Sequence, residues 1–85
     1  MPTTYEEDIR PLFRAQDLAC MVPHGIRLDQ AAWMCDAAPQ HGFADHGNAR
    51  LVQKRLVAGE MPPDAPWSKT QLATFQRWMD QGFQL

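Results

Sequence analysis

The chain has 85 residues, 45% of them hydrophobic and 21% charged, with a formal net charge of -2. A chain of this length supports a single modest core, so we expect residues 1–85 to form one domain. The hydrophobic fraction excludes a disordered chain. The slightly acidic balance argues against nucleic acid as a partner, and the short apolar runs argue against a membrane span.

The two cysteines, Cys20 and Cys35, are too few for a disulfide framework and are expected to be free thiols. The first ten residues lack a basic segment followed by an apolar one, so no signal peptide is predicted. The sequence as written therefore indicates a cytoplasmic protein. Removal of a leader would instead place the same chain in the periplasm.

A first short helix is predicted from a capping box formed by Thr4 and Glu7. Pro11 either lies inside this helix and kinks it or, if Asp8 is the cap, occupies the first turn. In both cases the helix should run to about residue 14 or 16. Its buried face is expected to hold Tyr5, Ile9, Leu12 and Phe13.

The middle of the chain is predicted to be mostly loop. Residues 17–28 show no clear period and contain Pro23 and Gly25, so they are interpreted as a loop. Asp29 is expected to cap a short helix over residues 30–38, which Pro39 ends. Residues 39–47 form a second expected loop.

A third helix should begin at Asp45 or His46 and end at Gly59. Its buried stripe is expected to contain Leu51, Val52, Leu56 and Val57.

Met61 comes next, and Pro62 and Pro63 should hold it on a stiff extended loop before Trp67. Ser68 and Gln71 form a second capping box, which predicts a last helix that ends at Gly82. The apolar face of this helix is expected to contain Leu72, Phe75, Trp78 and Met79. No strand pattern occurs. The sequence therefore predicts an all-α domain of about four short helices with long loops.

Three segments of the chain, in this order, resemble a small class I cytochrome c domain. They are Asp8-Ile-Arg-Pro-Leu-Phe13, Gly59-Glu-Met-Pro-Pro63 and Phe75-Gln-Arg-Trp-Met-Asp-Gln-Gly82. The resemblance covers nearly the whole chain and implies a small orthogonal helical fold. It also implies that the first and last helices cross, with Phe13 and Trp78 as candidates for the crossing. In that family a Cys-x-x-Cys-His motif binds haem, and a loop methionine supplies the other axial ligand.

The haem motif is degenerate in this chain, because the corresponding residues are Cys20-Met-Val-Pro23-His24. Cys20 and His24 match the family's first cysteine and its histidine, whereas Pro23 replaces the second cysteine. At most one thioether to haem could therefore form, through Cys20. His24 and Met61 still offer the imidazole and thioether that six-coordinate haem iron requires.

Two functions follow from this resemblance. The first is a haem-free relative of cytochrome c that acts through a protein partner or supports a neighbouring enzyme. Its pocket would be filled by side chains such as Met21, Met34, Trp33, Trp67 or Met61. The second is electron transfer by haem held non-covalently, or by one thioether from Cys20, with His24 and Met61 as iron ligands. The missing cysteine favours the haem-free hypothesis, in which no cofactor is bound.

Zinc binding is a minor alternative, since zinc takes cysteine and histidine ligands. The spacing of the available residues matches no tight zinc signature. They are Cys20, His24, Cys35, His41 and His46. No carboxylate pair, phosphate loop or nucleophile elbow is recognisable, so no enzymatic reaction is predicted.

Overall fold

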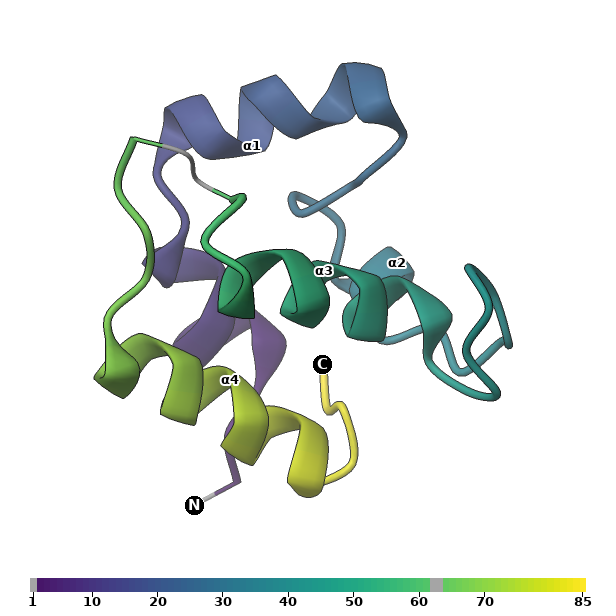
Figure 1. Cartoon of the computed structure of the whole chain (residues 1–85). Coiled ribbons are helices and arrows are strands. Elements are labelled where there is room, and N and C mark those ends of the chain that lie inside the picture. The colour runs from purple at the N-terminus through teal and green to yellow at the C-terminus, as the bar shows by residue number, and fades with distance from the viewer. Residues whose placement is uncertain (1, 62–63) are drawn as a thin grey trace.

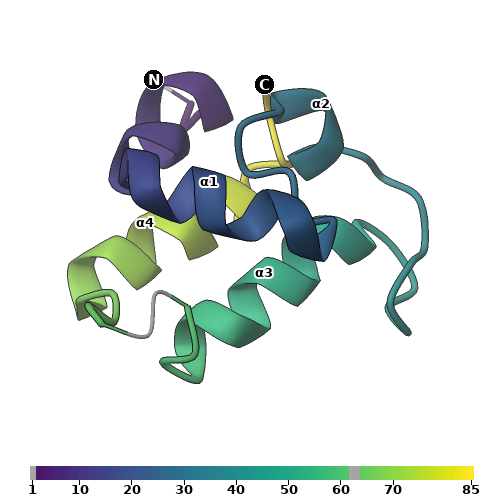
Figure 2. The ribbon, with the colours of Figure 1, turned by 90° about the horizontal axis from the view of Figure 1, so that it is seen from above.

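The computed structural model describes residues 2–61 and 64–85, and helices make up most of this part of the chain. Figures 1 and 2 show α3 and α4 next to each other, with α1 passing across α3. The described residues form no strand, so the all-α prediction is confirmed. The α-helices are α1 (Ala15–Met21), α2 (Ala31–Met34), α3 (Gly47–Val57) and α4 (Lys69–Asp80).

The N-terminal segment begins at Thr4, as predicted, but its geometry changes at Pro11. The Glu7 amide donates to the Thr4 hydroxyl at 3.3 Å, and the Thr4 amide donates to the Asp8 carboxylate at 2.8 Å. Asp8 therefore completes the cap in place of Glu7. The segment is a π-helical turn, η1 (Tyr5–Ile9), followed by a 3-10 turn, η2 (Arg10–Leu12). Pro11 lies within this Thr4-capped segment, where its lack of an N–H prevents a continuous α-helix.

The prediction of a loop over residues 17–28 is wrong for its first part. Helix α1 occupies Ala15–Met21, and a 3-10 turn, η3 (Val22–His24), continues it. The Asp17 carboxylate accepts from the Arg14 amide at 2.9 Å and caps the helix start. The apolar period is weak because only two side chains of this helix, Leu18 and Met21, pack against the core.

Helix α2 is shorter than predicted, and Asp29 does not cap it. Gln30 precedes the helix without a side-chain cap, and α2 ends at Met34, well before Pro39. The Asp29 carboxylate instead pairs with the Arg27 guanidinium at 3.0 Å. This local ion pair uses the oxygens that a helix cap would need.

Helix α3 begins after His46, one of the two predicted starts, and Gly59 follows its end with a left-handed φ of +75°. Val52 and Leu56 are buried as predicted. Val57 is 64% exposed, so its prediction as a core residue is wrong. A residue adjacent to Leu56 points about 100° away from it around the helix, which turns Val57 out of the core stripe.

Helix α4 has the predicted capping box. The Gln71 amide donates to the Ser68 hydroxyl at 3.2 Å, and the Ser68 amide donates to the Gln71 side chain at 2.9 Å. Gly82 follows the helix with a φ of +99°. Three of the four predicted face residues are buried, and Leu72 is partly buried against them. The three are Phe75, Trp78 and Met79.

Trp78 is the centre of an aromatic cluster that joins both ends of the chain. Its ring lies 5.4 Å from that of Tyr5 and 5.3 Å from those of Phe75 and Phe83. The indole N–H and the Tyr5 amide both donate to the Gln84 carbonyl, at 2.8 and 2.9 Å. Tyr5 thus packs against Trp78 where Phe13 was expected.

Phe13 packs instead on Trp67, with ring centroids 4.9 Å apart. Trp67 in turn contacts Phe75 edge to face at 6.1 Å. The aromatic cluster therefore extends from the C-terminal residues to the segment that precedes α4.

The segment before α3 passes very close to the helix start. A Cβ atom on Gly47 would overlap the backbone of Gln40, and the Gly47 amide donates to the Ala38 carbonyl at 3.1 Å. Glycine at this position lets residues 38–40 lie directly against α3.

We predict that Tyr5→Phe lowers the free energy of unfolding by about 1–2 kcal/mol, the usual cost of leaving a buried acceptor unpaired. The buried Tyr5 hydroxyl donates to the Leu28 carbonyl at 2.6 Å, and burial raises the pKa of the phenol, which keeps it a donor. Urea denaturation followed by circular dichroism measures the difference.

Thr74→Val is the matched control, since it removes an exposed hydroxyl that donates to the Thr70 carbonyl. Its effect should stay below about 0.5 kcal/mol. Equal stability of Tyr5→Phe and the wild type would show that this bond contributes nothing.

Candidate functional site

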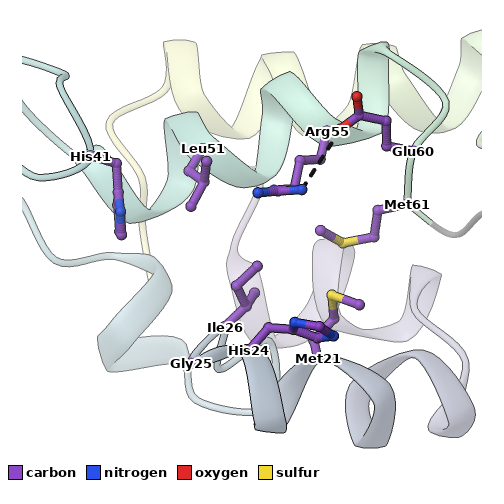
Figure 3. Close-up of a pocket in the computed structure, with 9 residues that line it drawn as sticks. All are labelled: Met21, His24, Gly25, Ile26, His41, Leu51, Arg55, Glu60 and Met61. Carbon is purple, nitrogen blue, oxygen red and sulfur yellow. Dashed lines mark ion pairs between the residues drawn. The ribbon is translucent and has the colours of Figure 1, made fainter.

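A cleft of about 370 Å³ opens between the α1–η3 segment and α3. Met21 and His24 line one wall, Leu51 and Arg55 of α3 line another, and Met61 closes the end (Figure 3). Its lining therefore combines two thioethers and two imidazoles, from His24 and His41, with one cationic and one anionic side chain.

A second hollow, of about 440 Å³, shares Met21, His24 and Met61 with this cleft and adds Cys20. The three residues singled out from the degenerate haem motif and the loop, Cys20, His24 and Met61, therefore line one hollow. They come from segments about 40 residues apart in the sequence. Hereafter "the cleft" denotes the two adjoining hollows.

Helix α1 and the turn η3 position three of the lining side chains, those of Cys20, Met21 and His24. Cys20 and Met21 lie at the end of α1, and His24 lies one turn further on, at the end of η3. Spacings of three and four residues put side chains on one helix face, so Met21 and Cys20 both neighbour His24. Gly25 ends the turn with a φ of +76°, and its amide donates to the Val22 carbonyl at 3.0 Å. Cys20 and His24 are exposed at the mouth of the cleft.

Met61 belongs to the apolar core and is only 2% exposed. Gly59 turns the chain out of α3, and the Glu60 amide donates to the Arg55 carbonyl at 3.0 Å, which directs Met61 inward. Pro62 and Pro63, predicted to stiffen this loop, lie outside the described residues. The cleft therefore has the buried Met61 sulfur on one wall and the exposed His24 imidazole on the facing wall.

An ion-pair network ties α1 to the segment after Met61. The Arg14 guanidinium donates to Asp17 at 2.9 Å and to Asp64 at 2.8 Å. These hydrogen bonds hold the pKa values of both carboxyls below their usual range. Asp17 and Asp64 also line the second hollow, so the network braces the walls of the cleft.

Sequence reasoning missed Arg55 and Glu60, which pair at 3.7 Å at the cleft and are both well exposed. The available signal was the spacing of Leu51 and Arg55, which puts both on one face of α3. His41, which was considered only as a zinc ligand, also lines the cleft.

The five residues considered for zinc occupy different surroundings. Cys20, His24 and His41 all line the cleft, but the His41 ring is also within 2.9 Å of the Asn48 side-chain oxygen. His46 stacks on Phe83 at 3.7 Å and pairs with Asp45 at 2.7 Å. Burial raises the pKa of Cys35 to about 11, which disfavours the thiolate that binds zinc. In the part of the chain that the structure describes, no three His, Cys, Asp or Glu side chains gather as a metal site.

Comparison of the chain with protein-family models, curated proteins and solved structures gives no match. None of the described helices is long and apolar enough to cross a membrane.

We predict that Arg14→Gln makes the free energy of unfolding decrease less steeply as the pH is lowered. A carboxyl whose pKa is lowered by folding stabilises the protein above its ordinary pKa of about 3.9 and loses that effect as pH falls through the lowered value. The wild type should therefore lose stability from about pH 5 downward, partly through Asp17 and Asp64. Urea midpoints measured between pH 7 and pH 3 test this dependence.

Arg77→Gln is the control, because the Arg77 guanidinium donates to the Thr3 hydroxyl. The Arg77→Gln variant should leave the dependence of the urea midpoint on pH unchanged. An Arg14→Gln profile parallel to that of the wild type would contradict the prediction.

Proposed function

We propose that this chain is a haem-free, cytochrome c-like domain that acts through a protein partner and not as an enzyme. The observation that carries the proposal is the packed interior. Side chains that could replace haem either belong to the apolar core or pack against it. They are Met34, Met61 and Trp67 in the core, with Met21 and Trp33 at its edge.

The degenerate haem motif supports the same proposal. Pro23 stands where a second thioether would form, and it lies within the short η3 turn. The core around Trp78 is built from the chain's own aromatic rings. Such a core gives the domain a source of stability other than a cofactor.

The outer face of α3 supplies a surface for the partner. Val57 lies one helix turn from Gln53 and Lys54 and two turns from Arg50, so these side chains share a face. With Phe43 and Ala58 they line a groove of about 450 Å³. Arg50 is already paired with Asp45 at 3.0 Å, whereas Lys54 lies beside the exposed Val57. An exposed apolar side chain next to a lysine suits a partner segment that presents an apolar residue beside an acidic one.

Electron transfer by haem is the second candidate, favoured by the joint position of His24 and Met61 at the cleft. An imidazole and a thioether are an axial ligand pair used by c-type cytochromes. Cys20 could add a single thioether bond. Bound haem would supply one-electron redox chemistry, and the chain's residues would hold it and limit its contact with water.

A haemin titration separates the two candidates. We expect the purified protein to be colourless, to unfold cooperatively and to gain no low-spin spectrum with haemin and dithionite, because side chains fill the interior. A sharp Soret band with α and β bands on reduction would instead support haem binding.

If that band appears, His24→Ala and Met61→Ala should each alter it, whereas His46→Ala, outside the cleft, should not. Unchanged spectra in both cleft variants would reject these residues as ligands.

A second prediction concerns the partner surface. Val57→Asp should weaken binding of a partner isolated from the native host at least tenfold, since it places a charge in the apolar part of the groove. Val22→Asp is the matched control, because Val22 is also exposed (40%) but lies on η3. Biolayer interferometry with the purified partner measures both. Equal affinity of Val57→Asp and the wild type would rule out this surface.

A further inference from the structure

Two methionine sulfurs and an imidazole line the same part of the cleft. Figure 3 shows the Met21 and Met61 side chains extending toward each other, with the His24 ring beside Met21. All three residues line both hollows of the cleft. We infer that they form a binding site for one Cu(I) ion, with two thioethers and one imidazole as ligands. This inference does not depend on the proposed partner or on haem.

The donor types select this ion. Thioether sulfur is a soft ligand that suits Cu(I), and imidazole also binds copper. Zinc and the hard cations prefer thiolate, imidazole or oxygen ligands. The site has one imidazole and two neutral sulfurs.

The charges around the cleft also suit a monovalent cation. Arg14 is shared between Asp17 and Asp64, which leaves one net negative charge in that network. Arg55 and Glu60 offset each other at the cleft. Three neutral ligands leave the ion with its single positive charge. The net negative charge of the Arg14, Asp17 and Asp64 network balances it.

The chain positions the ligands before any metal arrives. Helical spacing of three residues fixes Met21 next to His24, and the core holds Met61. His24 is exposed whereas Met61 is 2% exposed, so the ion can arrive from solvent at the imidazole and reach the sulfurs beyond it.

A competition titration under anaerobic, reducing conditions tests the site. Apo-protein is titrated with Cu(I) against the chromophoric chelator bicinchoninate. We expect one Cu(I) per chain and at least tenfold weaker binding by Met21→Leu and by Met61→Leu, because leucine keeps the volume and removes the sulfur. Met34→Leu and Met79→Leu, which alter other buried methionines, should bind within twofold of the wild type.

Cys20 neighbours His24 and could hold Cu(I) by its thiolate, so the titration is repeated with a Cys20→Ser, Cys35→Ser double variant. Retention of one Cu(I) supports the thioether site. Loss of all binding in this variant would mean that thiols alone hold the ion, which overturns the inference.

Nuclear magnetic resonance of methyl-labelled methionine gives a readout that needs no variant. Ag(I), a redox-inert substitute for Cu(I), should shift the Met21 and Met61 methyl signals and leave those of Met34 and Met79 in place. Unshifted signals at Met21 and Met61, or equal shifts at all four, would overturn the inference. Because these measurements use haem-free protein without a partner, their outcome is separate from that of the proposed function.

Discussion

The indole of Trp78 lies where the first helical turn, the last helix and the C-terminal residues meet. Its N–H is buried and therefore needs an acceptor, which the Gln84 carbonyl provides at 2.8 Å. The same carbonyl accepts from the Tyr5 amide, so one oxygen joins both ends of the described chain. Phe75, Phe83 and Tyr5 surround the ring. This arrangement fixes α4 against η1, and α3 packs alongside α4.

Different interactions hold the two walls of the cleft. The aromatic core holds the wall that carries Met61, and the Arg14 ion pairs hold the wall that carries His24. Met61 is held by the same core that contains Trp67 and Phe75, so its sulfur has a fixed position. The α1–η3 segment contributes only partly buried apolar side chains and relies on the Arg14 network to stay near residue 64. Exposed ion pairs stabilise weakly. The wall that carries His24 should therefore shift more easily than the wall that carries Met61, while Met21 and His24 keep their spacing along the helix.

Features set by neighbouring residues were predictable. The Ser68–Gln71 cap depends on local hydrogen bonds, and the helix stop at Gly59 depends on the backbone preference of glycine. Helix α1 was not predictable from periodicity, since it buries few apolar side chains. The pairing of Arg14 with Asp64 spans 50 residues and leaves no local signal. Of the site, Cys20, His24 and Met61 were singled out together through a family resemblance, and the part played by Arg55 was missed.

Gly47 carries a different kind of constraint. The backbone of Gln40 occupies the space that any Cβ at residue 47 would need. Every other amino acid would force residues 38–40 away from α3, whatever its polarity. Natural selection acting on the fold should therefore retain this glycine over long evolutionary times. Cys20 and His24 are exposed and contribute nothing to packing in the core. Selection would therefore conserve them only if they bind a ligand or a partner.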